Sequence, residues 1–320
     1  MRASCLLALS SARTSAIVSR WRLRCLGKTR TEPIMTITEQ VLNVGGLPVH
    51  VHSNSQSNHA KPVAILFFLH GRNGECGRLK DFIDSIYSQV HDKEQDLKHE
   101  LVIVSFDHRN HGHRLVDEKA NMGWNRDASK CNPRHAIDMY SIQSGTARDV
   151  SYLIDFLPAY LYPAGDRTIA QWGVAGISLG GHSTWLSLCQ ETRVKIGIPI
   201  VGCPDYLTLM TARAKKFGIS LEGSEYLPDS LLDLIRRSDP AATAYREMDP
   251  SRNPFYGKKI LVLSGGSDTL VPWTASEAFV ENLVVGPEGL KKKMVQAGAG
   301  HEYTPEMLAE MARFLVADVL

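Results

Sequence analysis

The 320-residue sequence lacks the features that mark several special classes of protein. It has no run of about 18 or more apolar residues, so no transmembrane helix is expected. It shows no internal repeat and no low-complexity segment. Its six cysteines are scattered without a C-x-x-C pair, which argues against a disulfide scaffold or a structural zinc site and fits a reducing compartment. A content of 43% hydrophobic and 22% charged residues is instead that of an ordinary globular protein.

The net charge of +2 hides an uneven distribution of charge. Residues 1–34 carry one acid, Glu32, and seven basic side chains: Arg2, Arg13, Arg20, Arg22, Arg24, Lys28 and Arg30. Without this segment the net charge becomes −4. A mildly acidic body does not favour nucleic acid as a partner.

Residues 1–34 have the Arg-rich, Ser-rich and acid-poor composition of a mitochondrial transit peptide. The alternative is an untranslated or disordered extension, with Met35 rather than Met1 as the working start. A secretory signal fits less well, because the apolar run 5–9 is short for the core of a signal peptide. The expected location is therefore cytoplasmic or mitochondrial.

Residues 35–320 predict one domain in which strands and helices alternate. Apolar runs predict strands at 62–69, 101–106, 168–177, 194–201, 259–264 and 293–296. Helical apolar spacing follows at 79–90, 141–157, 179–189, 207–216, 229–237, 274–283 and 304–320. This alternation indicates an α/β fold with a mostly parallel, doubly covered sheet that binds ligands at the carboxyl ends of its strands. The alternating stretch 41–52, interrupted by Gly-Gly, predicts an antiparallel hairpin at the sheet edge.

Two segments interrupt the alternation. Residues 114–140 are polar and too long for a plain connector, which is typical of a functional loop. Residues 203–256 carry two predicted short helices between strands, and we interpret them as a small helical lid rather than a separate domain.

The stretch 168–188 is the strongest functional signal in the sequence. A predicted strand meets Gly176-Ile177-Ser178-Leu179-Gly180, and a predicted helix follows at once. A G-x-S-x-G turn between strand and helix is the context of a nucleophile elbow. Its glycines allow the strained serine backbone and the close packing around it. Ser178 is therefore the candidate nucleophile.

A serine hydroxyl needs a base within hydrogen-bond reach, oriented by a carboxylate. In hydrolases with this elbow the acid and then the histidine follow the serine in the chain. Asp268 lies in the loop after the strand 259–264, and His301 is the one histidine that follows Asp268. The sequence thus predicts Ser178, Asp268 and His301 as a catalytic group. The expected oxyanion donors are the N–H groups of Leu179 and Arg72, the latter in the loop after strand 62–69.

At these motifs the sequence resembles the α/β-hydrolase superfamily, including its esterases and prolyl-oligopeptidase-like peptidases. The motifs are HGRNG (70–74), DHRNHG (107–112), GISLGG (176–181), SGGSDTLVP (264–272) and GAGHEY (298–303). The resemblance implies the α/β-hydrolase fold, a Ser178–His301–Asp268 triad, an acyl-enzyme mechanism and no cofactor. The sequence departs from the family at His111, where glycine is common, and in the 114–140 insertion, so the substrate class stays open.

The expected function is a serine hydrolase that cleaves a carboxylic ester of a small-molecule acyl substrate. A prolyl-oligopeptidase-like peptidase, a thioesterase on the same residues and a non-catalytic ligand-binding relative stay open as alternatives. The sequence does not indicate the oligomeric state.

Other polar residues are expected to have structural roles. His108, His111 and His113 are spaced like metal ligands, but we interpret them as a hydrogen-bonded turn and expect no metal. His182 is expected to pack or cap, and Cys76 to be a bystander thiol. Four aromatic residues are expected either in the core or along a pocket. They are Trp124, Tyr206, Tyr226 and Trp273.

Overall fold

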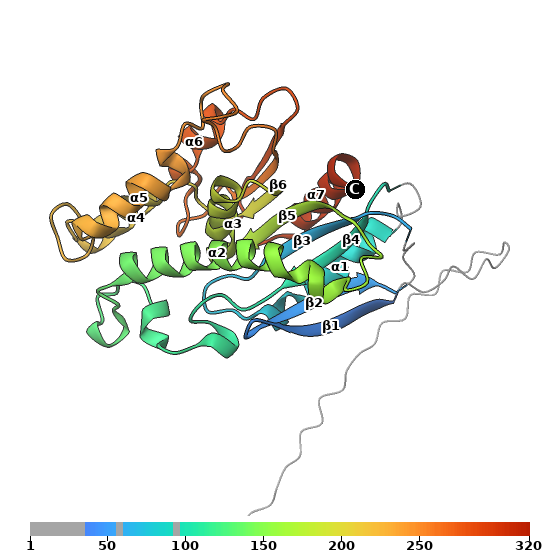
Figure 1. Ribbon diagram of the computed structural model, residues 1–320. Helices are drawn as coiled ribbons and strands as arrows, with labels where there is room; N and C mark the ends of the chain where they lie inside the picture. Colours follow the sequence, from blue (N-terminus) through green and yellow to red (C-terminus); the bar gives the residue numbers. More distant parts are fainter. Residues whose placement is uncertain (1–35, 56–59, 92–96) are drawn as a thin grey trace, which may run out of the picture. The chain divides into compact units, whose positions relative to one another are not determined.

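The computed structural model describes residues 36–55, 60–91 and 97–320. The described residues contain one eight-stranded sheet in the order β1-β2-β4-β3-β5-β6-β7-β8. Its strands are β1 (Ile37–Val44), β2 (Leu47–Asn54), β3 (Val63–Leu69), β4 (Glu100–Ser105), β5 (Ile169–Ile177), β6 (Val194–Ile200), β7 (Lys259–Gly265) and β8 (Leu290–Gln296). β1, β2 and β4 pair antiparallel, and from β4 to β8 every pair is parallel. The predicted edge hairpin and the predicted mostly parallel sheet are confirmed (Figure 1).

Helices cover both faces of this sheet (Figure 1). The helices of the described residues are α1 (Lys80–His91), α2 (His135–Leu161), α3 (Leu179–Gln190), α4 (Tyr206–Phe217), α5 (Asp229–Ser238), α6 (Glu277–Asn282) and α7 (Pro305–Phe314). One core cluster joins the sheet to α2, α3 and α6, and a second joins it to α1 and α7. The division follows the period of two in a strand, because Ile65 and Phe67 of β3 enter the first cluster while Leu66 and Phe68 enter the second.

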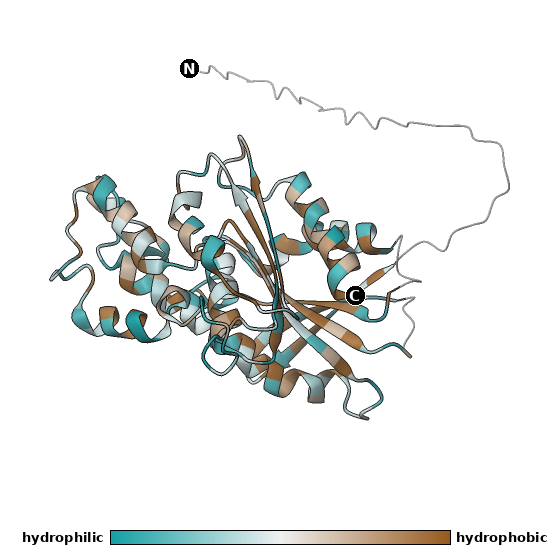
Figure 2. Ribbon diagram, turned by 90° about the horizontal axis from the view of Figure 1, so that it is seen from above, coloured by the Kyte–Doolittle hydropathy of each residue, from teal (hydrophilic) through white to brown (hydrophobic). Residues whose placement is uncertain are grey.

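Burial of these side chains is the main force that holds the layers together. β3 and β4 are buried along their whole length, and each fully buried large apolar side chain contributes about 1.5–3 kcal/mol. Figure 2 shows apolar residues concentrated along the strands, with mixed character on the helices. Within the described ranges, none of the helices combines the length and apolar character that crossing a membrane requires.

A third core cluster lies under α4 and α5 and joins them to the start of α2. It includes Tyr206 and Leu209 of α4, Ile235 of α5, Tyr140 of α2 and Trp124 of the 114–140 segment. Because it also contains Leu179, this cluster connects the two helices of segment 203–256 to the residue after Ser178.

The structure corrects three boundaries. Segment 114–140 is not a loop throughout, because α2 begins at His135 rather than at the predicted Ser141. In the first turns of α2, Ala136 and Met139 pack in the third cluster and not against the sheet. They therefore lie off the apolar face from which the helix was predicted. β8 begins at Leu290 rather than at the predicted Lys293. Its run of lysines is typical of an edge strand but lacks the apolar pattern from which strands were predicted. The last helix changes at Leu315 into a π-helical turn. The predicted extension, residues 1–34, lies outside the described residues.

Candidate active site

The turn between β5 and α3 places Ser178 in a strained conformation. Ser178 has φ 55° and ψ −107°, which non-glycine residues rarely adopt. The flanking glycines leave no room for a side chain. A methyl group on Gly176 would lie 2.4 Å from the carbonyl carbon of Gly180, and one on Gly180 would lie 2.4 Å from the carbonyl oxygen of Leu69. The sequence pattern is therefore required by contacts within the turn and with β3.

The structure brings the three predicted residues together at the carboxyl ends of β5, β7 and β8. His301 Nε2 lies 2.8 Å from Ser178 Oγ, and His301 Nδ1 lies 2.7 Å from Asp268 Oδ2. Because an ionised carboxylate only accepts, Nδ1 carries the hydrogen and Nε2 is left to accept from the serine hydroxyl. The His301 side chain remains 23% exposed, so this arrangement is accessible from solvent.

Asp268 is held as a charged, oriented acceptor. Its side chain is fully buried, and its second oxygen accepts from the N–H groups of Leu270 at 2.8 Å and Val271 at 2.9 Å. Burial alone would raise the pKa of Asp268, but the hydrogen bonds from His301 and these N–H groups outweigh it, so the pKa is lowered. The carboxylate stays ionised and fixes the ring of His301.

The loop after β3 lies beside the serine. Gly71 and Gly74 close a turn through a hydrogen bond of 3.0 Å, with Asn73 at φ 61°. A methyl group on Gly71 would lie 3.8 Å from Cβ of Ser178. In the part of the chain that the structure describes, neither the N–H of Arg72 nor the N–H of Leu179 donates to another group. Both predicted oxyanion donors are thus available next to Ser178.

All three histidines in the metal-like pattern have hydrogen-bond partners in the backbone or in side chains. His108 Nε2 donates to the carbonyl oxygen of His70 at 2.7 Å, and the N–H of His108 donates to His70 Nε2 at 3.1 Å. The ring of His111 lies 3.0 Å from the carbonyl oxygen of Arg109. His113 contacts Asp107 at 3.0 Å. No group of three or more histidine, cysteine, aspartate or glutamate side chains in the described ranges is arranged to hold a metal ion.

The reciprocal pair of His70 and His108 fixes the two loops that follow β3 and β4. Burial lowers the pKa of His70 to about 4 and holds that of His108 well below its ordinary value, so both rings are neutral near pH 7. Asp107 adds a third connection, because it accepts from the N–H of Cys76 at 2.8 Å. Burial raises the pKa of the Cys76 thiol to about 12, which makes it a poor nucleophile.

His182 and the aromatic candidates lie inside the protein. His182 is buried and accepts from the N–H of Cys203 at 2.9 Å. Trp124 and Tyr206 are buried in the third core cluster, and Tyr226 packs against it. Trp273 packs partly buried against the first cluster.

The sequence analysis missed two residues near the serine, Arg213 and His135. Arg213, on α4, donates from Nη1 to His135 Nε2 at 2.8 Å and from Nη2 to the carbonyl oxygen of Leu270 at 3.2 Å. His135 Nδ1 donates to the carbonyl oxygen of Met122 at 3.0 Å. These contacts join segments far apart in the chain, so no local sequence pattern could have indicated them.

A pocket of about 610 Å³ opens beside the turn that carries Arg72. Its lining includes Asn73 and Gly74 of this turn, His111, and Met122 of the insertion. The insertion therefore forms part of a cavity that adjoins the loop after β3.

Comparison with solved structures finds this arrangement of strands and helices in other proteins. A protein from Thermus thermophilus matches with a TM-score of 0.60 and 21% identity, over 88% of this chain and 97% of its own. An acetyl xylan esterase from a Paenibacillus species matches with a TM-score of 0.52 and 17% identity, over 90% and 86%. A puromycin-hydrolysing peptidase from Mycobacterium tuberculosis matches with a TM-score of 0.54 and 14% identity, over 89% of this chain and 39% of its own.

No protein-family model and no curated protein matches the chain. At these identities the structural matches establish the fold. The neighbours include an esterase and a peptidase, and the eight-stranded, mostly parallel sheet with helices on both faces fits the same fold. The chain therefore has the α/β-hydrolase fold.

Proposed function

We propose that the protein is a serine hydrolase that cleaves carboxylic esters through an acyl-enzyme intermediate. The observation that carries this proposal is the continuous hydrogen-bonded path from Ser178 Oγ to His301 Nε2, 2.8 Å, and from His301 Nδ1 to Asp268 Oδ2, 2.7 Å. A serine, a histidine and an ionised carboxylate in this order are the parts of an activated nucleophile.

In the first half of the reaction, Ser178 Oγ attacks the acyl carbon while its proton moves to His301 Nε2. Asp268 stabilises the imidazolium that forms and holds its orientation. The charge that develops on the carbonyl oxygen is stabilised by the N–H groups of Leu179 and Arg72. The first of these lies at the start of α3, where free N–H groups and the helix dipole favour negative charge. His301 then protonates the departing alcohol, and the acyl group remains on Ser178.

In the second half, His301 takes a proton from water, which attacks the acyl carbon. The same two N–H groups hold the second tetrahedral intermediate. Collapse of this intermediate releases the acid and returns the proton to Ser178 Oγ. No cofactor is needed for these steps.

We favour an ester as the substrate because segment 203–256 adds only the short helices α4 and α5, not a large cap domain that would select peptides. An ester also has a better leaving group than an amide. The esterase among the structural neighbours agrees with this choice. A peptidase or thioesterase would use the same residues. Comparison of ester, amide and thioester substrates distinguishes these three activities.

The test is labelling by a fluorophosphonate probe, together with hydrolysis of p-nitrophenyl esters, aminoacyl amides and acyl thioesters. Ser178→Ala should abolish both labelling and hydrolysis. A matched control is Ser220→Ala, because Ser220 lies exposed in Gly218–Leu221, which repeats the residues GISL found at 176–179. Labelling that persists in Ser178→Ala would refute the nucleophile, and faster turnover of amides or thioesters would replace the ester assignment.

A further inference from the structure

Two arginines beside the candidate nucleophile have no acidic partner. Arg72 and Arg213 are both partly buried, and Nη1 of Arg72 is fully buried without a hydrogen-bond partner. No aspartate or glutamate of the described ranges forms an ion pair with either guanidinium. Burial of an unpaired charge is costly, so such groups are normally paired in a folded protein.

The two guanidinium groups converge on His135. A methyl group on Gly123 would lie 3.7 Å from Nη1 of Arg72 and 4.0 Å from Cε1 of His135. Nε2 of His135, the ring atom next to Cε1, accepts from Nη1 of Arg213 at 2.8 Å. Burial, together with the charges of Arg213 and Arg72, lowers the pKa of His135 to about 3. The ring is therefore neutral and cannot supply or balance charge.

The pair lies next to the reacting groups. Arg72 follows Gly71, the residue beside Ser178. Arg213 donates to the carbonyl oxygen of Leu270, just beyond Asp268. The pKa of His182, one helical turn after Ser178, is lowered to about 3 by burial first, and also by the charges of Arg213, His301 and Arg72.

Other arginines of the same protein show what pairing looks like. Arg167 contacts Glu100 in a buried ion pair. Arg193 contacts Glu191 at 2.8 Å, and Arg114 contacts Asp149 at 2.8 Å. Among the described arginines that are not exposed, Arg72 and Arg213 therefore differ from Arg114 and Arg167 in having no acidic partner. Asp268 attracts Arg213 through its charge but forms no ion pair with it, because one carboxylate oxygen accepts from Leu270 and Val271 and the other binds His301.

We propose that Arg72 and Arg213 bind an anionic oxygen group, a carboxylate or a phosphate, on the substrate that Ser178 attacks. The planar guanidinium is the side chain best suited to carboxylate and phosphate oxygens. The inference rests on the proposed hydrolase function and narrows its substrate class to acidic esters. It also gives segment 114–140 a role, since Met122, Gly123 and His135 position the two cations.

The test compares two esters that differ in one charge, p-nitrophenyl hydrogen glutarate and p-nitrophenyl methyl glutarate. The wild-type protein should have a kcat/KM about tenfold or more higher for the anionic ester. Arg213→Met and Arg72→Met should each remove most of this preference. Lys216→Met is the matched control, because Lys216 lies exposed on the same helix and donates to the neighbouring carbonyl oxygen of Thr269. It should keep the preference.

A second pair of esters places the charge on the leaving group, p-acetoxybenzoate and its methyl ester. A preference for p-acetoxybenzoate alone would assign the arginines to the leaving group, and a preference for the glutarate alone would assign them to the acyl group. Equal rates for the charged and neutral members of both pairs, unchanged in the arginine variants, would overturn the inference while leaving the hydrolase function intact.

A binding measurement separates the inference from the hydrolase function. In the Ser178→Ala protein, free glutarate and inorganic phosphate are added and the melting temperature is recorded. The favoured anion should raise the melting temperature, and Arg213→Met should abolish the rise. If neither anion raises it and no acidic ester is preferred, the inference fails. If no ester is hydrolysed but the anion-dependent rise is present, the hydrolase function fails while the anion site stands.

Discussion

An arginine at the amino ends of the strands and the two arginines beside Ser178 have opposite surroundings. At the amino ends of the strands, Arg167 precedes β5, pairs with Glu100 of β4 and donates to the carbonyl oxygen of Lys61 at 3.1 Å. At the carboxyl ends, Arg72 and Arg213 contact neutral groups at most. The chain supplies the counter-charge where an arginine serves only the fold. Beside Ser178 the counter-charge is left to come from a substrate.

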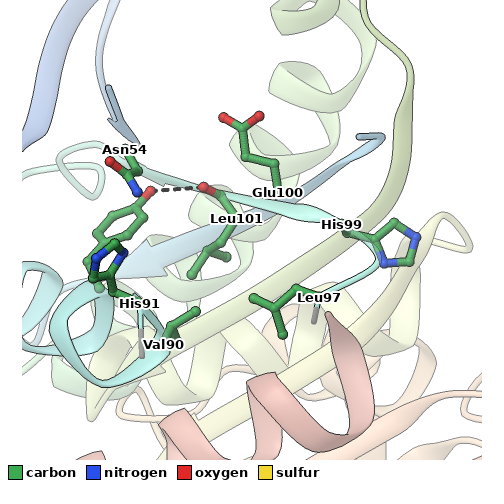
Figure 3. A pocket seen from close by; sticks show the side chains of 8 residues that line it. Asn54, Val90, His91, Leu97, His99, Glu100 and Leu101 are labelled. Atoms are coloured by element: carbon green, nitrogen blue, oxygen red, sulfur yellow. Dashed lines mark hydrogen bonds between the residues drawn. The ribbon is translucent and has the colours of Figure 1, made fainter. Parts of the chain in front are cut away.

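The small pocket at the amino end agrees with this contrast. Figure 3 shows it lined by side chains that include Asn54, Val90, Leu97 and Leu101. The hydroxyl of Tyr87, which also lines it, donates to the carbonyl oxygen of His52 at 2.6 Å and accepts from the N–H of Ile103 at 3.3 Å. Polar groups at the amino end connect the strands to α1. Substitutions there should therefore lower the free energy of unfolding and leave turnover unchanged.

The largest expected effect lies at the carboxyl end. Asp268→Asn should lower kcat by up to about 10⁴-fold, because the amide favours the wrong tautomer of His301. The unfolding midpoint should change little by comparison. Ester hydrolysis and urea unfolding of the same preparation measure both quantities. A loss of kcat below about tenfold would point to a different acid.

The matching change at the amino end should affect stability alone. Glu100→Gln leaves Arg167 buried without its charge partner and should cost about 3–5 kcal/mol of unfolding free energy. The kcat/KM of the folded fraction should stay at the wild-type value. Glu288→Gln, at an exposed site, is the control and should cost almost nothing. A loss of turnover in Glu100→Gln would show that the amino end also contributes to the reaction, which would contradict the contrast between stability at one end and turnover at the other.

The carboxyl end should also be the more sensitive to acid. The pKa of His182 is about 3 in the folded protein, below its ordinary value of 6.5. Between these values the unfolded state binds the extra proton, so stability falls as the pH drops below 6.5, by about 1.4 kcal/mol per pH unit for this residue. Urea unfolding between pH 7 and pH 5 should show a shallower slope in His182→Gln. Identical slopes would mean that His182 is protonated in the fold.

The smallest expected effect is on stability at Arg213. Removal of an unpaired, partly buried charge relieves its desolvation while losing two hydrogen bonds, so Arg213→Met should stay within about 1 kcal/mol of the wild type. Urea unfolding at pH 7 measures the difference. A loss as large as that of Glu100→Gln would show that Arg213 serves the fold, and would remove the contrast between the two ends.

The sequence was sufficient to predict the features that depend on local pattern. Each buried strand is a run of apolar residues, and Ser178 follows such a run inside a tight glycine pattern. Asp268 and His301 follow β7 and β8, so the parallel sheet carries their loops to one edge. The structure brings these residues within hydrogen-bond distance.

The parts that could not be predicted depend on long-range packing. The start of α2 is buried by α4 and α5 rather than by the sheet, so its apolar residues do not follow the face predicted from the rest of the helix. The contact between Arg213 and His135 arises only when this packing is complete. The lack of an acidic partner at Arg72 likewise cannot be inferred from any pattern in the sequence.

Under the proposed function, the conformation of Ser178 implies a trade-off between activity and stability. A non-glycine residue held at φ 55° stores about 1–3 kcal/mol of strain. Ser178→Gly would release most of it, because glycine adopts positive φ freely. The inactive glycine variant should therefore melt at a higher temperature than the active protein. A natural variant with glycine at position 178 would be more stable than the protein with serine. Only selection for the proposed reaction would then retain Ser178.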